Sequence, residues 1–166
     1  MSVIRPATRH DVPAILQMIH ELAIYEKEPD AVRNTPEMLA EVLFGGNPRV
    51  FATMAENSAG EVQGFALWFL NYSTWEGVHG IYLEDLYVSP DARGEGHGKA
   101  LLKHLAATAV ENGYARVDWS VLDWNEPSIN FYRSLGARPL DGWFTFRLTG
   151  DALESFGTRT AASVRG

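Results

Sequence analysis

The chain has 166 residues, 46% of them apolar and 21% charged, which is the size and composition of one ordinary globular domain. It contains no cysteine, which excludes a disulfide framework, a thiolate zinc site and a cysteine nucleophile. The formal net charge of -7 argues against a nucleic acid partner, because phosphate backbones are bound by clustered Lys and Arg.

The sequence also lacks a membrane-spanning stretch, which needs about 18 consecutive apolar residues. Residues 1–10 lack the apolar core of a secretory signal. We therefore expect a soluble, cytoplasmic protein with no membrane partner. Its acidic balance suits a cationic partner, although the same charge also serves solubility.

Two periodicities alternate along the chain. Apolar residues recur every three or four positions in some segments, which predicts helices, and alternate with polar residues in others, which predicts strands. Thr8 and Asp11 form a capping box before the first helix, and Thr35 is the N-cap of the second. The predicted elements are, in chain order, a strand at 3–4, helices over 12–23 and 36–44, strands over 50–55, 62–70 and 81–88, a helix over 99–112, a strand over 115–122, a helix over 127–135 and a last strand over 143–148.

This order of elements predicts an α/β fold. A meander of antiparallel strands followed by strand–helix–strand gives a central mixed, mostly antiparallel, twisted sheet flanked by helices. We expect one domain over 1–156. Residues 157–166 are small and polar, and we expect them to form a flexible tail.

A glycine-rich turn lies between the strand over 81–88 and the helix that follows. It reads Arg93-Gly94-Glu95-Gly96-His97-Gly98. Glycines let backbone N–H groups point into one concavity, the helix start adds the positive end of its dipole, and Arg93 adds a cation. The turn is a candidate anion site with a diphosphate as its natural ligand. A purely structural glycine turn is the alternative.

Two familiar phosphate-binding motifs do not fit this turn. In a Walker loop a Ser or Thr follows Gly-Lys, but here Ala100 follows Lys99, and Arg93 occupies the position of the first glycine. A dinucleotide fingerprint reads G-x-G-x-x-G, whereas this turn reads G-x-G-x-G. A nucleotide-dependent oxidoreductase is therefore disfavoured.

The pattern Arg93-x-x-Gly96-x-Gly98, after a strand ending Leu86-Tyr87-Val88, resembles the acetyl-coenzyme A loop of the GNAT N-acetyltransferases. Within that superfamily the chain most resembles the diamine (spermidine/spermine) N-acetyltransferases, over nearly its whole length up to Leu148. The resemblance implies acetyl-coenzyme A as cosubstrate and a homodimer. Besides the turn, the matching segments are 4–8, 21–23 with 25–26, 82–85 and 125–132.

The resemblance also implies which residues contact the coenzyme. They come from the strand end, the turn, and the helix that begins after Asn125. They are Leu86, Tyr87, Val88, Arg93, Gly94, Glu95, Gly96, His97, Gly98, Lys99, Asn125, Ser128, Tyr132 and Arg133.

Acyl transfer to an amine needs a base, because an alkyl ammonium has a pKa of about 10.4 and is protonated at pH 7. Without a cysteine no thioester acyl-enzyme forms, so we expect direct attack in a ternary complex.

The resemblance implies Glu84 as the base, acting through water, and Tyr132 as the acid for the leaving thiolate. The structural alternatives are that Glu84 and Asp85 are an exposed acidic pair without a catalytic role, and that Tyr132 packs in the core. Glu84 and Asp85 face opposite ways in a regular strand, and only a bulge or splay brings both to one site.

A small cationic amine is the expected acceptor. The polyamine enzymes carry an acidic residue where this chain has Ser73, and a Glu where it has Asp141. A diamine or polyamine is the leading acceptor, thialysine or a lysine-like amino acid is the alternative, and a non-catalytic acyl-coenzyme A sensor is less favoured. No histidine has metal-ligand spacing, so we expect no metal. The expected acceptor-binding residues are Tyr25, Glu26, Trp75, Glu84, Asp85 and Asp141.

Overall fold

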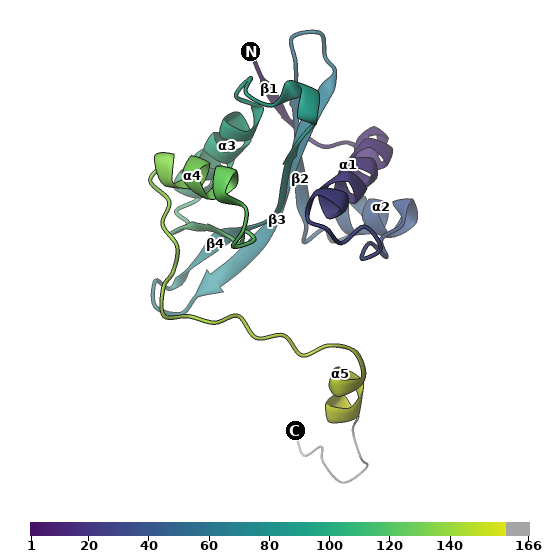
Figure 1. The fold of residues 1–166 in the computed structure, drawn as a ribbon, viewed down its shortest axis with the longest axis vertical. Helices are drawn as coiled ribbons and strands as arrows, with labels where there is room; N and C mark the ends of the chain where they lie inside the picture. Colours follow the sequence, from purple (N-terminus) through teal and green to yellow (C-terminus); the bar gives the residue numbers. More distant parts are fainter. Residues whose placement is uncertain (159–166) are drawn as a thin grey trace. The chain divides into compact units, whose positions relative to one another are not determined.

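The computed structural model describes residues 1–158 (Figure 1). Its contacts divide the chain into two units, Met1–Trp124 and a second that begins at Asn125. The first unit contains a five-stranded sheet in the order β1-β2-β3-β4-β5. The strands are β1 (Val3–Pro6), β2 (Phe51–Glu56), β3 (Val62–Ser73), β4 (Val78–Val88) and β5 (Val117–Trp119).

The sheet is mixed and mostly antiparallel, which confirms the predicted fold class. Only β4 and β5 pair in parallel, and the other neighbours are antiparallel. Helix α3 lies on one side of the sheet, and α1 and α2 lie on the other (Figure 1). The three helices of this unit are α1 (Val12–Tyr25), α2 (Pro36–Phe44) and α3 (His97–Glu111), with short 3-10 turns η1 (Arg9–Asp11) and η2 (Pro90–Ala92).

The core occupies both faces of the central strands. Phe65 and Ala66 are neighbours on β3, so they point to opposite faces, and both are fully buried. Phe65 joins a cluster with Ile15 of α1 and Leu39 of α2. On the other face α3, which buries Leu101 among other residues, packs against β2, β3 and β4. A sheet covered on both faces has continuous apolar strands, as β2 and β3 do.

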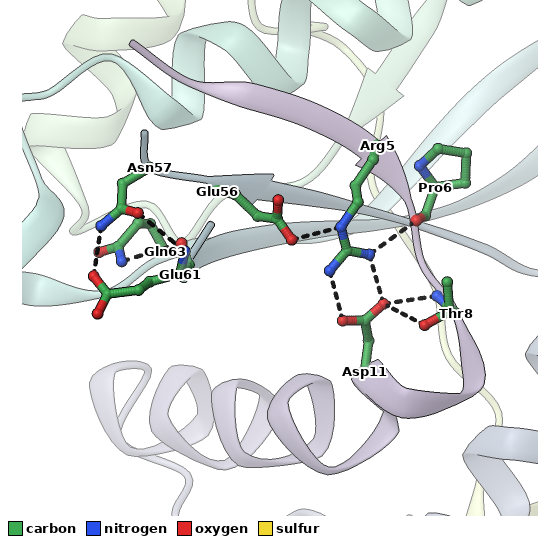
Figure 2. A network of polar contacts seen from close by, with 8 residues as sticks. All are labelled: Arg5, Pro6, Thr8, Asp11, Glu56, Asn57, Glu61 and Gln63. Carbon is green, nitrogen blue, oxygen red and sulfur yellow. Dashed lines mark hydrogen bonds and ion pairs between the residues drawn. The ribbon is translucent and has the colours of Figure 1, made fainter. Parts of the chain in front are cut away.

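An ion-pair network around Arg5 joins β1, β2 and the start of α1 (Figure 2). The Nη1 and Nη2 groups of Arg5 donate to the two carboxylate oxygens of Asp11 at 2.7 and 2.9 Å, and its Nε donates to Glu56 Oε1 at 2.6 Å. Asp11 is only 6% exposed and also accepts from the backbone N–H of Thr8 at 2.7 Å. The predicted capping box is therefore present, one turn before α1, at η1.

The second unit contains α4 (Glu126–Ser134) and α5 (Gly150–Gly157). The predicted strand over 143–148 is wrong, because this stretch forms neither helix nor strand. Its large side chains (Trp143, Phe144, Phe146 and Leu148) are 52% to 93% exposed. An alternating apolar pattern makes a strand only where a neighbouring strand satisfies its backbone, and no strand of the described residues pairs with it.

The last strand of the sheet is shorter than predicted. Strand β5 covers 117–119 in place of 115–122, because it pairs only with Ile81–Leu83 of β4. The single domain over 1–156 stays a prediction, and residues 159–166 of the predicted tail lie outside the described residues. Within residues 1–158 no helix combines the length and apolarity needed to cross a membrane.

Replacing Arg5 tests the ion-pair network. The pKa of Asp11 lies below its usual value because Arg5 donates hydrogen bonds to the carboxylate, while burial works in the opposite direction. We expect Arg5→Met to lower the free energy of unfolding at pH 7 by about 2–3 kcal/mol, since it leaves a buried carboxylate unpaired. A depressed folded pKa stabilises above the unfolded value of about 3.9, so the difference between the two proteins shrinks as the pH falls below 4. Urea unfolding at pH 7 and pH 3 measures both effects.

Arg116→Met is the matched control. Arg116 pairs with Asp118 at 3.0 Å, but both side chains are substantially exposed. A loss under about 1 kcal/mol is expected for such a surface pair. Equal losses in the two variants contradict a special role for the Arg5 network.

Candidate active site

The predicted anion-binding turn has the backbone that an anion site needs. Gly94 and Gly96 have φ angles of 89° and 88°, in the left-handed region that favours glycine. A Cβ on either residue would meet nothing within 4 Å, so the constraint is conformational and not steric. Gly96 is the N-cap of α3, and the first turn of that helix presents N–H groups without intrahelical acceptors.

Arg93 is held at the end of β4. Its Nε donates to the carbonyl oxygen of Val88 at 3.2 Å. Its Cζ lies 5.4 Å from the ring centre of Tyr25 and 5.8 Å from that of Tyr87. These contacts fix the guanidinium between the end of α1 and the start of the turn, where its remaining N–H groups can bind a phosphate.

His97 and Lys99 begin α3 in different environments. The His97 side chain is 2% exposed and contacts Ser2 and Glu95, so only its backbone N–H belongs to the anion-binding surface. Lys99 is exposed in the first turn of the helix. The turn therefore offers backbone N–H groups and the cations of Arg93 and Lys99 to an anion.

Strand β4 carries a bulge at Glu84. Asp85 lies opposite Leu67 of β3 and Leu83 lies opposite Trp68, so Glu84 has no partner in the register. A bulge breaks the alternation of neighbouring side chains. The structure thus contains the feature that could bring Glu84 and Asp85 to one site.

Glu26, Glu84 and Asp85 form an acidic cluster between the end of α1 and this bulge. Burial, followed by the charges of Glu84 and Glu26, raises the pKa of Asp85 to about 6. Burial, followed by the charge of Glu84, also raises the pKa of Glu26. Three carboxylates that repel one another in a partly buried environment favour a cation as their partner.

Beyond Leu83, β4 has a strand neighbour on one side only. Strand β5 ends its pairing at Leu83, and no other strand of residues 1–158 takes its place. Ser89 donates to the Gln63 carbonyl of β3 at 2.8 Å, and backbone direction alternates along a strand. The N–H groups of Leu86 and Val88 therefore face the open edge, whereas that of Tyr87 faces β3.

Asn125, Ser128, Tyr132 and Arg133 belong to the second unit. Asn125 is the N-cap of α4, and its Oδ1 accepts from the Ser128 backbone N–H at 3.4 Å. Tyr132 lies seven residues later on the same helix, with its ring centre 5.6 Å from that of Phe131. Their spacing of three, four and seven puts Asn125, Ser128 and Tyr132 on one helix face. Their coenzyme contacts stay predictions.

Within the first unit, Trp75 lies away from the acidic cluster. Trp75 lies in the turn between β3 and β4 and is 87% exposed. It precedes Glu84 by nine residues, and the strand between Val78 and Glu84 alone spans about 20 Å. Asp141 is an exposed residue of the second unit. Their acceptor contacts also stay predictions.

Sequence reasoning missed several contacts that shape the site. Trp124 packs near Tyr25, with ring centres 6.0 Å apart, and the Lys27 amine lies 4.3 Å from the Trp124 ring centre. Glu21 accepts from the Tyr87 hydroxyl at 2.9 Å, which ties α1 to β4. The residues of these pairs are 66 to 99 positions apart in the chain, so no local pattern signals the contacts. Lys27 also adopts a left-handed φ of 65°. Among the described residues, no group of three or more His, Cys, Asp or Glu side chains could hold a metal ion.

Comparison with known proteins places this geometry among acyl-transferring enzymes. Residues 15–137 match the acetyltransferase (GNAT) family. A thialysine N-epsilon-acetyltransferase of Sus scrofa is 42% identical over 161 residues, covering 91% of this chain and 94% of its own. An L-ornithine N5-acetyltransferase of Arabidopsis thaliana is 32% identical over 198 residues, covering 93% of this chain and 87% of its own.

Two further similarities extend the comparison. The spermidine/spermine N(1)-acetyltransferase-like protein 1 of Homo sapiens is 36% identical over 159 residues, covering 90% of this chain but 23% of its own. Among solved structures, an integron cassette protein from V. cholerae has a TM-score of 0.79 at 27% identity, covering 95% of this chain and 98% of that one.

Replacing Asp85 tests the acidic cluster. A carboxyl whose folded pKa is raised stabilises the protein below its unfolded pKa of about 3.9 and loses that contribution as the pH rises through its folded value. We therefore expect Asp85→Asn to raise the free energy of unfolding at pH 7 by about 1–3 kcal/mol and to change it little at pH 4. Urea unfolding at the two pH values measures the difference. Asp123→Asn, at an exposed aspartate, is the control, and equal stability of Asp85→Asn and the unmodified protein at pH 7 contradicts the raised pKa.

Proposed function

We propose that this protein, which belongs to the acetyltransferase (GNAT) family, transfers acetyl from acetyl-coenzyme A to a primary amine of a small cationic acceptor, a diamine or polyamine. As a family member it is an acyl-coenzyme A-dependent N-acetyltransferase. One observation carries the choice of acceptor: the acidic cluster lies directly beside the open edge of β4. An amine held by those carboxylates is next to the backbone groups that would bind the acetyl donor.

The donor site follows from the chain order of three features. The acidic residues at 84–85, the open edge at 86–88 and the turn at 93–98 follow one another within fifteen residues. A diphosphate bound at the turn leaves its flexible arm to run back along the open edge. The N–H of Leu86 or Val88 is then the donor for the thioester carbonyl, and backbone N–H groups are suited to a developing oxyanion.

The acceptor must lose a proton before it attacks. The neutral amine nitrogen attacks the carbonyl carbon, the carbon–sulfur bond breaks, and the leaving thiolate takes a proton. Glu84, exposed at the bulge, is the proposed base and acts through water, with Glu26 and Asp85 binding the cationic acceptor. Tyr132 is the proposed acid for the thiolate, since a phenol of pKa about 10 matches it in basicity.

A diamino acid such as thialysine is the second candidate acceptor. The names of the Sus scrofa and Arabidopsis thaliana relatives favour it, since both describe the acetylation of a side-chain amine in an amino acid. Ser73 supports it too, because this residue is buried and its hydroxyl accepts from the Glu76 N–H at 3.1 Å, where the polyamine enzymes place a carboxylate. The homodimer, the absence of a metal and the cytoplasmic location expected from the sequence stay predictions.

Release of thiol from acetyl-coenzyme A tests the function. The acceptor panel comprises putrescine, spermidine, spermine, lysine, thialysine, ornithine, a peptide amine and an aminoglycoside. We expect the highest kcat/KM with a diamine or polyamine, and a clear preference for thialysine selects the second candidate. Binding of the coenzyme with no thiol release from any amine overturns the proposal in favour of a non-catalytic acyl-coenzyme A sensor.

Replacing Tyr132 tests the proposed acid. We expect Tyr132→Phe to lower kcat roughly 100-fold, because the thiolate loses its proton donor. The dissociation constant of coenzyme A, measured by calorimetry, should change less than about threefold, because the ring is kept. Tyr72→Phe, at an exposed strand position, is the control. An undiminished kcat at saturating substrates removes Tyr132 from the mechanism.

A further inference from the structure

A buried histidine lies behind the coenzyme-binding turn. The Nδ1 of His97 is 2.7 Å from the Ser2 hydroxyl, and its Nε2 is 3.2 Å from Glu95 Oε2. The imidazole is 2% exposed, whereas the Glu95 side chain is 60% exposed. The ring thus connects the residue before β1 to the centre of the turn, 95 positions further along the chain.

The chemistry of the two partners fixes the direction of these hydrogen bonds. An ionised carboxylate only accepts, so the contact with Glu95 requires the proton on Nε2. In a neutral imidazole Nδ1 is then an acceptor, and the Ser2 hydroxyl donates to it. Ser2 therefore holds the tautomer that presents an N–H to Glu95.

Glu95 places a carboxylate within the proposed anion-binding turn, because it lies between Gly94 and Gly96. A carboxylate is a natural ligand for N–H groups at a helix N-terminus. Being part of the turn, it competes at a high effective concentration with any diphosphate. Its charge also repels that of a diphosphate.

We propose that His97, supported by Ser2, is a positioning residue that holds the Glu95 carboxylate off the anion-binding groups of the turn. The held turn stays available to the diphosphate of the coenzyme. This role rests on the proposed function, since it presumes that the turn binds acetyl-coenzyme A. It assigns His97 no contact with the reacting atoms and gives Ser2, far from the turn in sequence, a part in coenzyme affinity.

The decisive experiment is a charge-removal rescue. We expect His97→Leu to raise the KM for acetyl-coenzyme A about 3- to 10-fold and to leave kcat at saturation within twofold, because only occupancy of the turn is affected. The double variant His97→Leu/Glu95→Gln should recover most of the affinity, since the competing charge is gone. Direct calorimetric binding of coenzyme A to each variant should show the same order without catalysis.

Matched controls come from the same helix. His104→Leu should leave the KM for acetyl-coenzyme A unchanged, because His104 lies two turns from the diphosphate end of α3. Adding Glu111→Gln to His97→Leu should give no recovery, because that exposed carboxylate lies at the far end of α3. A recovery with Glu111→Gln equal to that with Glu95→Gln points to net charge and overturns the proposal.

A purely structural His97 gives a different result. In that case His97→Leu lowers the melting temperature and leaves the KM for acetyl-coenzyme A unchanged. A raised KM that Glu95→Gln does not rescue also indicates a structural role. Either outcome overturns the proposal. If His97→Leu does not fold, Ser2→Ala is the substitute variant, with Ser2→Thr as its conservative rescue. Ser2→Ala should raise the KM about 2- to 5-fold, and an unchanged KM overturns the proposal. Failure of the unmodified protein to bind coenzyme A contradicts the proposed function itself, which separates the two claims.

Discussion

The site depends on the point where β4 loses β5. The two strands pair only through Ile81–Leu83, and β4 then runs on to Val88 with β3 as its single neighbour. Backbone groups on an open strand edge need hydrogen-bond partners, and a ligand can supply them. The early end of β5 therefore leaves the second half of β4 with an open edge, which is the proposed binding edge for the acetyl donor. The same residues would be buried in the sheet if β5 followed the length that its sequence predicts.

The bulge at Glu84 lies at this transition. It follows the last residue paired with β5 and precedes the part of β4 with an open edge. A bulge bends its strand and adds local twist. This bulge coincides with the end of the β5 pairing, and it sets two acidic residues beside the open edge. The repulsion within the acidic cluster is a cost to the fold that a bound cation would offset.

Local patterns were enough to predict much of the fold and the turn. The caps at Thr8 and Thr35 lie where the sequence places them, because a cap needs only residues three or four positions apart. The glycines of the turn were readable for the same reason, since a left-handed φ leaves a residue-type signature. The bulge at Glu84 was only one option, because register depends on the neighbouring strand.

The remaining contacts join segments far apart in the chain. Strand 143–148 was predicted from alternation alone, but alternation does not supply the neighbour that a strand requires. The contact between Ser2 and His97 spans 95 positions and leaves no periodic trace. The raised pKa of Asp85 likewise depends on Glu26, from another element. Such features need the fold before they can be recognised.

Gly64 shows that the position of the open edge of β4 depends on β3 as well as on the early end of β5. This glycine of β3 lies opposite Val88, and a Cβ there would collide with the carbonyl oxygen of Tyr87. Backbone cannot yield as the end of a long side chain can, so any larger residue would push the end of β4 away from β3. The glycine therefore lets β3 hold Tyr87 and Val88 closely, and Val88 in turn holds Arg93 through its carbonyl. The absence of a side chain at Gly64 of β3 therefore helps to fix the position of the Arg93 guanidinium. The open edge of β4 and the glycine-rich turn thus depend on each other.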